Sequence, residues 1–411
     1  MEDLVNYLPR TIEKVLLEVS EMFKVVLLTG MRQSGKSTCL EHLSRTSGNR
    51  TYLNLDEASL LEEANFSTSH FFEFHPTPLL IDEIQRAPKL LLQIKAEVDA
   101  HAQPGQIWAT GSQKFSLMKG VSESLAGRLI PLELMPLSIY ERVGKGLEQK
   151  PYVPSINPTS PLSIPSSDSI WETIWQGAWP GVIHATARQR KFFYDALVQT
   201  YIERDIQSIS GVEKIYEFRK FMKLLAIKTG QELRLTALAE EVGVSVPTIK
   251  AWLSTAEASG IIYLLRPYYA NINKQLVKSP KVYFTDTGLA SYLCEFDDPE
   301  MLKNYKDAGA FFETFAIIEI LKSWIHNGEQ PELFFYRDSK TQEEIDLLIR
   351  HRGKLHPVEI KSTNRPNRST IKNFGVLESL REPIGHGAVI CTSEKNYPLG
   401  EGCTAHSLWS I

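Results

Sequence analysis

The sequence predicts an α/β fold in which a parallel sheet is followed by a helical unit and a smaller α/β unit. Three observations lead to this prediction. Short apolar segments alternate with helical stretches between Lys24 and Met135, which is typical of a parallel sheet covered on both faces. A glycine-rich loop, Gly30–Ser37, lies between the first apolar segment and a helix. Five prolines within residues 150–168 then interrupt the pattern and indicate a linker.

The composition is that of an ordinary globular protein. Of 411 residues, 43% are apolar and 23% are charged, which predicts two or three domains and argues against a disordered or repeat protein. No run of about 18 apolar residues predicts a membrane helix, and the acidic start MEDLVNYLPR does not resemble a secretory signal. The four cysteines form no CxxC pair, so we expect neither a zinc knuckle nor disulfides, and a cytoplasmic location.

The pattern of apolar residues places the individual elements. After a lead-in with an amphipathic helix (1–23) and a helix at about 36–45, strands are expected at 24–30, 51–56, 78–84, 106–112 and 129–135. The pattern of residues 171–265 predicts an all-helical segment. The last part predicts helices at 311–325 and 370–380 and strands at 344–349, 357–360 and 387–391. We therefore divide the chain into domains 1–145, 169–300 and 301–411, with a linker at 146–168.

The glycine-rich loop has the sequence of a phosphate-binding loop. GMRQSGKS matches G-x-x-x-x-G-K-[ST] between a predicted strand and a predicted helix, the context that makes this motif specific. Backbone N–H groups and the helix N-terminus then face the phosphates. Lys36 is expected to reach the β- and γ-phosphates, and the Ser37 hydroxyl to hold Mg²⁺. The predicted nucleotide-binding residues are Gly30, Met31, Arg32, Gln33, Ser34, Gly35, Lys36, Ser37 and Thr38.

A second motif, which contains two acidic residues, supports a nucleotide site. LLIDEIQ (Leu79–Gln85) is an apolar strand that ends in two acids. Asp82 suits a metal-bound water, and Glu83 is expected to orient or deprotonate the attacking water. The alternative is a strand that ends in an ordinary polar turn, which the neighbouring phosphate loop disfavours.

With ATGSQKF (Ala109–Phe115) and SLAGRLIPLEL (Ser124–Leu134), these motifs resemble a family of bacterial and archaeal AAA-type ATPases. In that family a P-loop NTPase domain is fused to a C-terminal domain of unassigned role. The resemblance implies that Ser112 is a sensor of the γ-phosphate. It also implies that Arg128 contacts nucleotide, in cis or from a neighbouring subunit, although a helix-capping arginine is the alternative. The small helical lid that usually accompanies AAA-type ATPases is not obvious in this sequence. The sequence therefore does not decide whether the chain assembles into a homo-oligomeric ring.

The middle of the chain combines two family-like motifs with a helix-turn-helix pattern. WQGAWPGVI (Trp175–Ile183) and YIERDI (Tyr201–Ile206) resemble the motifs that follow the linker in the same family, and neither suggests a physical role. Further on, Gly243 gives a turn, Ser245 caps the next helix, and Thr248–Ala258 is the candidate recognition helix.

The chain after this helix pair is basic. Residues 266–281 contain no acid and four cations, namely Arg266, Lys274, Lys278 and Lys281. A winged helix with a basic wing suits DNA phosphates, although Lys250 is the only base-reading cation in the recognition helix. Winged helices also pack against proteins, so both roles stay open.

Four residues near the C-terminus form a candidate metal site. Glu313 lies on the apolar stripe of a helix whose polar side carries Glu319 and Lys322. Asp346 lies in a strand rich in Ile and Leu, and Glu359 and Lys361 share one face of the next strand. This pattern resembles a restriction-endonuclease-like nuclease core, which implies Mg²⁺ binding by Asp346, Glu359 and Glu313 and a water-holding or basic role for Lys361.

These motifs lead to one expectation and two alternatives. We expect a P-loop ATPase that uses ATP and Mg²⁺ to drive or gate an action on DNA, through a winged-helix domain and a restriction-endonuclease-like domain. The first alternative is an ATP-controlled switch or adaptor that binds protein or nucleic acid without cutting it. The second is a transcriptional regulator that uses the winged helix. The expected partners are ATP and DNA, with no membrane partner.

Overall fold

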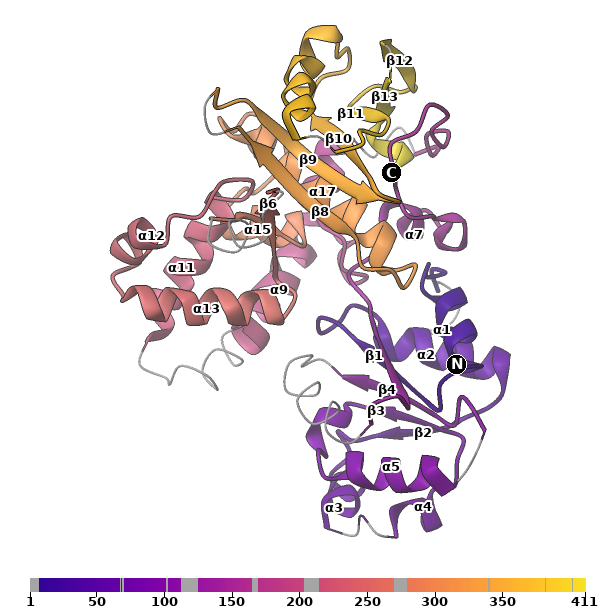
Figure 1. Ribbon diagram of the computed structural model, residues 1–411. Coiled ribbons are helices and arrows are strands. Elements are labelled where there is room, and N and C mark those ends of the chain that lie inside the picture. Colours follow the sequence, from indigo (N-terminus) through magenta and orange to yellow (C-terminus); the bar gives the residue numbers. More distant parts are fainter. Residues whose placement is uncertain are drawn as a thin grey trace.

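The computed structural model describes residues 7–66, 68, 70–100, 103–111, 125–164, 169–202, 214–269, 279–338, 341–380, 382–400 and 402–411. Three units follow one another along the chain, at the bottom, left and top of Figure 1. We call them the first unit (7–148), the helical unit (169–303) and the C-terminal unit (308–411). Among the described residues, no helix is long and apolar enough to cross a membrane.

The first unit is built on the predicted parallel sheet, with strand order β2-β3-β4-β1-β5. Its strands are β1 (Val25–Thr29), β2 (Thr51–Asn54), β3 (Leu79–Asp82), β4 (Ile107–Gly111) and β5 (Leu129–Glu133). Its helices are α1 (Glu13–Ser20), α2 (Lys36–Ser47), α3 (Ala58–Phe66), α4 (Phe71–Phe74), η1 (Ile84–Arg86), α5 (Leu90–Ala100), α7 (Ile139–Arg142) and η2 (Gly146–Glu148). All five strands lie within the ranges expected from the sequence.

Alternate strand residues face opposite layers of helices, as period-two geometry requires. Val25 and Leu27 of β1 belong to the apolar cluster that contains residues of α3 and α5. Val26 and Leu28 belong to the cluster that contains residues of α1 and α2. The sheet is therefore covered on both faces, which explains why its strands are continuous apolar runs.

The proline-rich stretch after the first unit packs against the C-terminal unit. The Tyr152 hydroxyl lies 2.7 Å from His406 Nδ1, and the Leu162 backbone N–H donates to Trp409 O. Residues 150–164 are therefore docked along their path and do not form the free tether expected of a linker.

The helical unit contains the predicted helix pair. Its elements are α8 (Ile170–Gln176), α9 (Ala187–Leu197), the π-helical turn η3 (Val198–Ile202), α11 (Ile215–Ile227), α12 (Leu235–Val242), α13 (Val246–Ala258), α15 (Thr287–Leu293), α16 (Pro299–Lys303) and strands β6 (Ile262–Pro267) and β7 (Lys281–Phe284). Gly243 adopts the left-handed conformation after α12, and the Ser245 hydroxyl accepts a hydrogen bond from the Thr248 N–H. Both local predictions for this turn are confirmed.

The C-terminal unit is built on a mixed sheet with strand order β12-β13-β11-β10-β9-β8-β6-β7. Its own elements are α17 (Ala308–Ile325), β8 (Glu332–Arg337), β9 (Glu344–His351), β10 (Lys354–Ile360), the 3₁₀ helix η5 (Arg368–Leu380), β11 (Gly387–Cys391), β12 (Tyr397–Gly400), β13 (Cys403–Ser407) and η6 (Leu408–Ser410). The hairpin β6–β7 of the helical unit joins this sheet where Arg266 pairs with Phe334. The sequence pattern predicted neither this shared sheet nor strands β8, β12 and β13.

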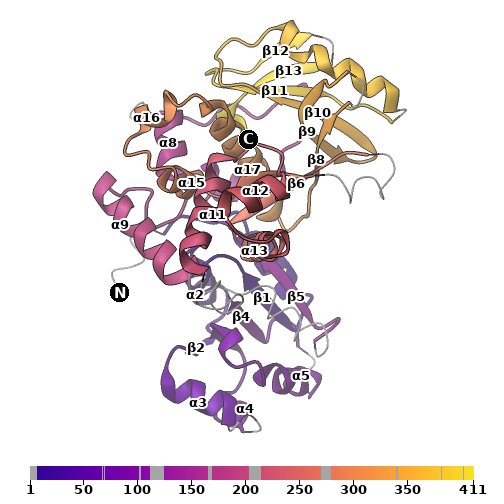
Figure 2. The same cartoon turned by 90° about the vertical axis from the view of Figure 1, so that its left-hand side faces the viewer.

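Helix α17 lies at the centre of the molecule, as both views show (Figures 1 and 2). The prediction that Glu319 and Lys322 form its polar, solvated side is wrong, because the two side chains are 1% and 2% exposed. They form an ion pair of 2.7 Å and bind the backbone of the segment after β5, at Ile139 N and Leu137 O. The polar face of α17 therefore docks the C-terminal unit onto the first unit.

Candidate functional site

The phosphate loop connects β1 to α2 at the carboxyl edge of the first sheet. Gly35 has a φ of 93°, a left-handed conformation that favours glycine, and it precedes the first residue of α2. Gly30 is required for a different reason, because a Cβ there would lie 2.1 Å from the carbonyl oxygen of Leu134. Both glycines of the motif thus have steric roles.

The Lys36 ammonium lies at the loop and is nearly buried. Its Nζ donates a hydrogen bond of 2.8 Å to the Met31 carbonyl. An ammonium group has three donors, so two remain for phosphate oxygens. Burial lowers the pKa of Lys36 to about 8, although the Glu83 and Asp82 carboxylates oppose this shift. The predicted phosphate-binding lysine is therefore a desolvated cation.

Asp82 ends β3 next to the phosphate loop. Its Oδ1 lies 3.0 Å from the Ser37 hydroxyl, and its Oδ2 accepts a hydrogen bond of 2.9 Å from the Tyr52 hydroxyl. The Thr110 hydroxyl, from β4 between β1 and β3, also donates to Oδ1. A hydroxyl and a carboxylate at this distance are the oxygen donors that Mg²⁺ prefers, so the predicted pair fits a magnesium ion.

Glu83 follows Asp82 in a left-handed backbone conformation with a φ of 57°. This conformation is uncommon for residues other than glycine and occurs preferentially at functional sites. The Gln85 side-chain amide donates a hydrogen bond to its carboxylate. Glu83 is thus held near Lys36, where an attacking water could be oriented.

The structure does not bring Arg128 to the phosphate loop of its own chain. Arg128 lies immediately before β5, whose first residue, Leu129, pairs with Val25 at the start of β1. The phosphate loop follows the other end of β1, which is about 15 Å away for a five-residue strand. Arg128 instead pairs with Asp99. Contact from a neighbouring subunit stays a prediction, and Ser112 lies outside the described residues.

Arg10 is a buried contact of the loop that the sequence did not reveal. Its Nη1 donates 2.7 Å to Ser34 O, its Nη2 donates 2.8 Å to Met135 O, and its Nε lies 3.2 Å from Glu141. Glu141 also lies 3.1 Å from His326, the residue after α17. Burial opposes the charge of Glu141, but Arg10 and His326 hold its pKa well below its usual range.

The C-terminal residues predicted to converge do so on one face of the second sheet. Lys361 Nζ lies 2.9 Å from Asp346 and 2.8 Å from Glu359. Glu313 accepts hydrogen bonds from the Tyr283 hydroxyl (2.6 Å) and from Lys281 (3.3 Å).

Lysines accompany these carboxylates. Lys281 pairs with both Glu313 and Glu344, just as Lys361 pairs with both Asp346 and Glu359. Over the described part of the chain, no group of three or more His, Cys, Asp or Glu side chains is placed to hold a metal ion. Burial and the nearby Asp346 raise the pKa of Glu359 to about 8, and burial raises that of Glu313 to about 7.

Of the four cations in the predicted basic wing, one is buried and another is exposed. Lys281 is 4% exposed and bound to carboxylates, so its assignment to DNA phosphates is wrong, because the pairing of β7 with β6 places it inside the shared sheet. Arg266 is exposed, and so is Lys250 on α13. Lys274 and Lys278 lie outside the described residues.

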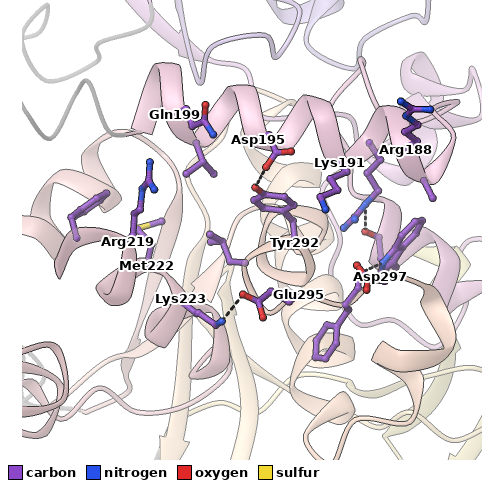
Figure 3. Close-up of a pocket in the computed structure, with 17 residues that line it drawn as sticks. Arg188, Lys191, Asp195, Gln199, Arg219, Met222, Lys223, Tyr292, Glu295 and Asp297 are labelled. Carbon is purple, nitrogen blue, oxygen red and sulfur yellow. Dashed lines mark hydrogen bonds and ion pairs between the residues drawn. The ribbon is translucent and has the colours of Figure 1, made fainter. Parts of the chain in front are cut away.

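A cavity of about 760 Å³ lies in the helical unit between α9, α11 and the residues after α15 (Figure 3). Its rim carries Arg188, Lys191, Arg219 and Lys223. Lys223 pairs with Glu295 at 2.7 Å, while the Tyr292 hydroxyl donates to Asp195. The cavity is lined by none of the predicted site residues, and several of its polar side chains are paired with one another.

Three segments of the chain match models of protein families. Residues 22–143 match an AAA domain, residues 167–300 a domain of unknown function (DUF8612), and residues 308–411 another domain of unknown function (DUF4143). Uncharacterized proteins of Mycobacterium bovis and Mycobacterium tuberculosis are each 27% identical over 383 residues, which cover 93% of this chain and 79% of theirs.

A similar solved structure is the Walker-type ATPase paby2304 of Pyrococcus abyssi. It is 14% identical, has a TM-score of 0.44, and the match covers 70% of this chain and 95% of that chain. The AAA match, together with the loop and the Ser37–Asp82 pair, identifies the first unit as a P-loop ATPase domain of the AAA type.

Proposed function

We propose that this protein is an ATP-hydrolysing switch whose nucleotide state controls its helical and C-terminal units. The observation that carries the proposal is the pairing of Ser37 with Asp82 at 3.0 Å beside the buried Lys36 ammonium. Lys36 binds the β- and γ-phosphates, while Ser37 and Asp82 hold Mg²⁺, which neutralises phosphate charge when bound. Glu83 orients or deprotonates the attacking water.

Two variants test the ATPase. Lys36→Ala removes the main side-chain charge on the phosphates and should abolish turnover. Glu83→Gln keeps the shape of the side chain and should preserve nucleotide binding while slowing hydrolysis by about 10²–10⁴-fold, as expected for loss of a general base. Phosphate release and binding of a fluorescent ATP analogue are measured on both. Wild-type turnover in Glu83→Gln would contradict the role of Glu83.

The C-terminal unit supports a role in binding better than in cleavage. A metal-dependent nuclease requires carboxylates gathered around a cation, whereas Lys281 and Lys361 each pair with two of the carboxylates here. The exposed face of α13 carries both Lys250 and Glu257 and is not strongly basic. We therefore favour a switch or adaptor that binds protein or nucleic acid without cutting it.

DNA cleavage is the second candidate, and one observation favours it. Asp346, Glu359 and Lys361 converge on one sheet face. Burial, together with the nearby Asp346 carboxylate, raises the pKa of Glu359 to about 8, and a bound divalent cation would relieve the repulsion between the two carboxylates. Wild-type protein is incubated with duplex DNA, single-stranded DNA and RNA, with ATP and Mg²⁺ or Mn²⁺. Cleavage that disappears in Asp346→Ala and Lys361→Ala, with ATP hydrolysis intact, would establish the nuclease.

A further inference from the structure

The segment Trp175–Ile183, WQGAWPGVI, places a tryptophan of the helical unit against the phosphate loop. Trp179 is 1% exposed, and its indole N–H donates a hydrogen bond of 3.1 Å to the Arg32 carbonyl. A Cβ on Gly35 would lie 3.8 Å from Pro180 Cγ, so the proline packs against the same loop. The segment Trp175–Ile183, for which the sequence suggested no physical role, therefore contacts the phosphate loop of the nucleotide site.

This hydrogen bond acts on the backbone of the phosphate-binding loop. In a planar trans peptide, the carbonyl and the following N–H point in opposite directions. A donor that holds the Arg32 carbonyl therefore orients the Gln33 N–H toward the other side, and Arg10 does the same for the Gly35 N–H through Ser34 O. Gln33 has a φ of 60°, a strained conformation that needs support from its surroundings.

We propose that Trp179 is a positioning residue for nucleotide binding, and that docking of the helical unit thereby sets the affinity of the phosphate loop for nucleotide. The inference rests on the ATPase function proposed above and adds its regulation. Trp179 touches no reacting atom and acts through the backbone of the loop. Because the donor belongs to another unit, movement of that unit away from the loop lowers nucleotide affinity.

The helical unit holds the backbone next to Trp179 through Asp286. The backbone N–H of the preceding residue, Ala178, donates 2.6 Å to Asp286 Oδ2, and the Tyr194 hydroxyl donates 2.9 Å to Asp286 Oδ1. Asp286 also caps α15 through the Leu289 N–H at 2.7 Å. The turn is thus fixed to the helices of its own unit, and it also binds the first unit, where the Leu137 N–H donates to Ala178 O and Arg142 donates to Gly177 O.

A second contact comes from the same unit at a different point. Gly260, just after α13, approaches Met31 so closely that a Cβ there would lie 3.3 Å from Met31 Cγ. The Thr285 hydroxyl lies 3.9 Å from Met31 Sδ. The helical unit therefore contacts the loop at Met31 and Arg32 as well as beside Gly35, and one end of the helix-turn-helix lies at the phosphate loop.

The test removes the indole N–H and keeps an aromatic ring. Trp179→Phe should weaken binding of ADP and of a fluorescent ATP analogue by about 3- to 10-fold, the effect of one net hydrogen bond. It should raise the KM for ATP more than it lowers kcat, because Glu83 and Lys36 are unchanged. Trp175→Phe is the matched control, because Trp175 also donates its indole N–H to a backbone carbonyl, that of Phe296 at 2.7 Å, away from the loop.

Each outcome decides a specific point. Equal nucleotide affinities in wild type, Trp179→Phe and Trp175→Phe overturn the inference, and so does an equal loss in both variants. If Trp179→Phe fails to fold, benzothienylalanine at position 179 keeps the bicyclic ring and replaces only the N–H, and the same affinity loss is expected. A wild-type protein that neither binds nor hydrolyses ATP refutes the proposed function itself, which separates that failure from the failure of this inference.

Discussion

The affinity of the protein for nucleotide should fall steeply as the pH rises above 8. Burial lowers the pKa of Lys36 to about 8 in the free protein. A bound polyphosphate favours the charged form, which raises the pKa of this lysine in the complex. The fraction of free protein with a charged Lys36 falls from about one half at pH 8 to about one tenth at pH 9, so the Kd for Mg-ADP should increase about 5-fold over this interval.

Isothermal titration calorimetry measures both the Kd and the linked proton. At pH 8, binding should take up about half a proton per nucleotide, seen as a difference in apparent enthalpy between buffers of unequal ionisation enthalpy. Lys36→Arg is the control, because arginine stays charged throughout this range, and its Kd should not follow the same curve. A wild-type Kd that is constant from pH 7.5 to 9.5, without proton uptake, would refute the assignment of Lys36 as a desolvated phosphate ligand.

Two further predictions concern the buried charges outside the loop. Arg10→Met should destabilise the protein by about 3–5 kcal/mol in urea unfolding, because it leaves the Glu141 carboxylate buried without its arginine partner; an unchanged midpoint would contradict this. Glu359 has a folded pKa raised to about 8, so its contribution to stability is present below its unfolded pKa of about 4.5 and is lost as the pH rises toward 8. The unfolding temperature of Glu359→Gln should therefore depend less on pH between 5 and 8 than that of the wild type. If the unfolding temperatures of variant and wild type change with pH in parallel, another group is responsible for the pH dependence.

The sequence predicted most of the first unit because its signals are local. A strand, a glycine-rich turn and a helix N-terminus are adjacent in the chain, so GMRQSGKS carries its own context. Asp82 was found for a related reason, since the carboxyl ends of parallel strands meet at one edge of a sheet. Strand periodicity also placed Glu359 and Lys361 on one strand face, whereas their convergence with Asp346 was implied by the resemblance to a nuclease core.

The partners of charged side chains were harder to predict. Periodicity gives the face of a helix or strand on which a side chain lies, but not the groups that pack against that face. Glu319 and Lys322 fall on the polar side of α17 by spacing, and both are buried because a segment of the first unit covers that side. Lys281 belongs to an acid-free stretch by composition, and the sheet pairing turns it toward Glu313 and Glu344. In each case the decisive neighbour comes from a distant part of the chain.

Trp179 shows where this limit lies and what the sequence still offers. A buried tryptophan needs an acceptor for its indole N–H, so each of the two tryptophans of WQGAWPGVI requires an acceptor wherever the fold buries it. The acceptor of Trp179 lies 147 positions away in the phosphate loop, and that of Trp175 lies 121 positions away in its own unit. The chemistry of tryptophan thus predicts that each indole N–H has an acceptor, but only the fold shows that one of the two tryptophans contacts the phosphate loop and the other does not.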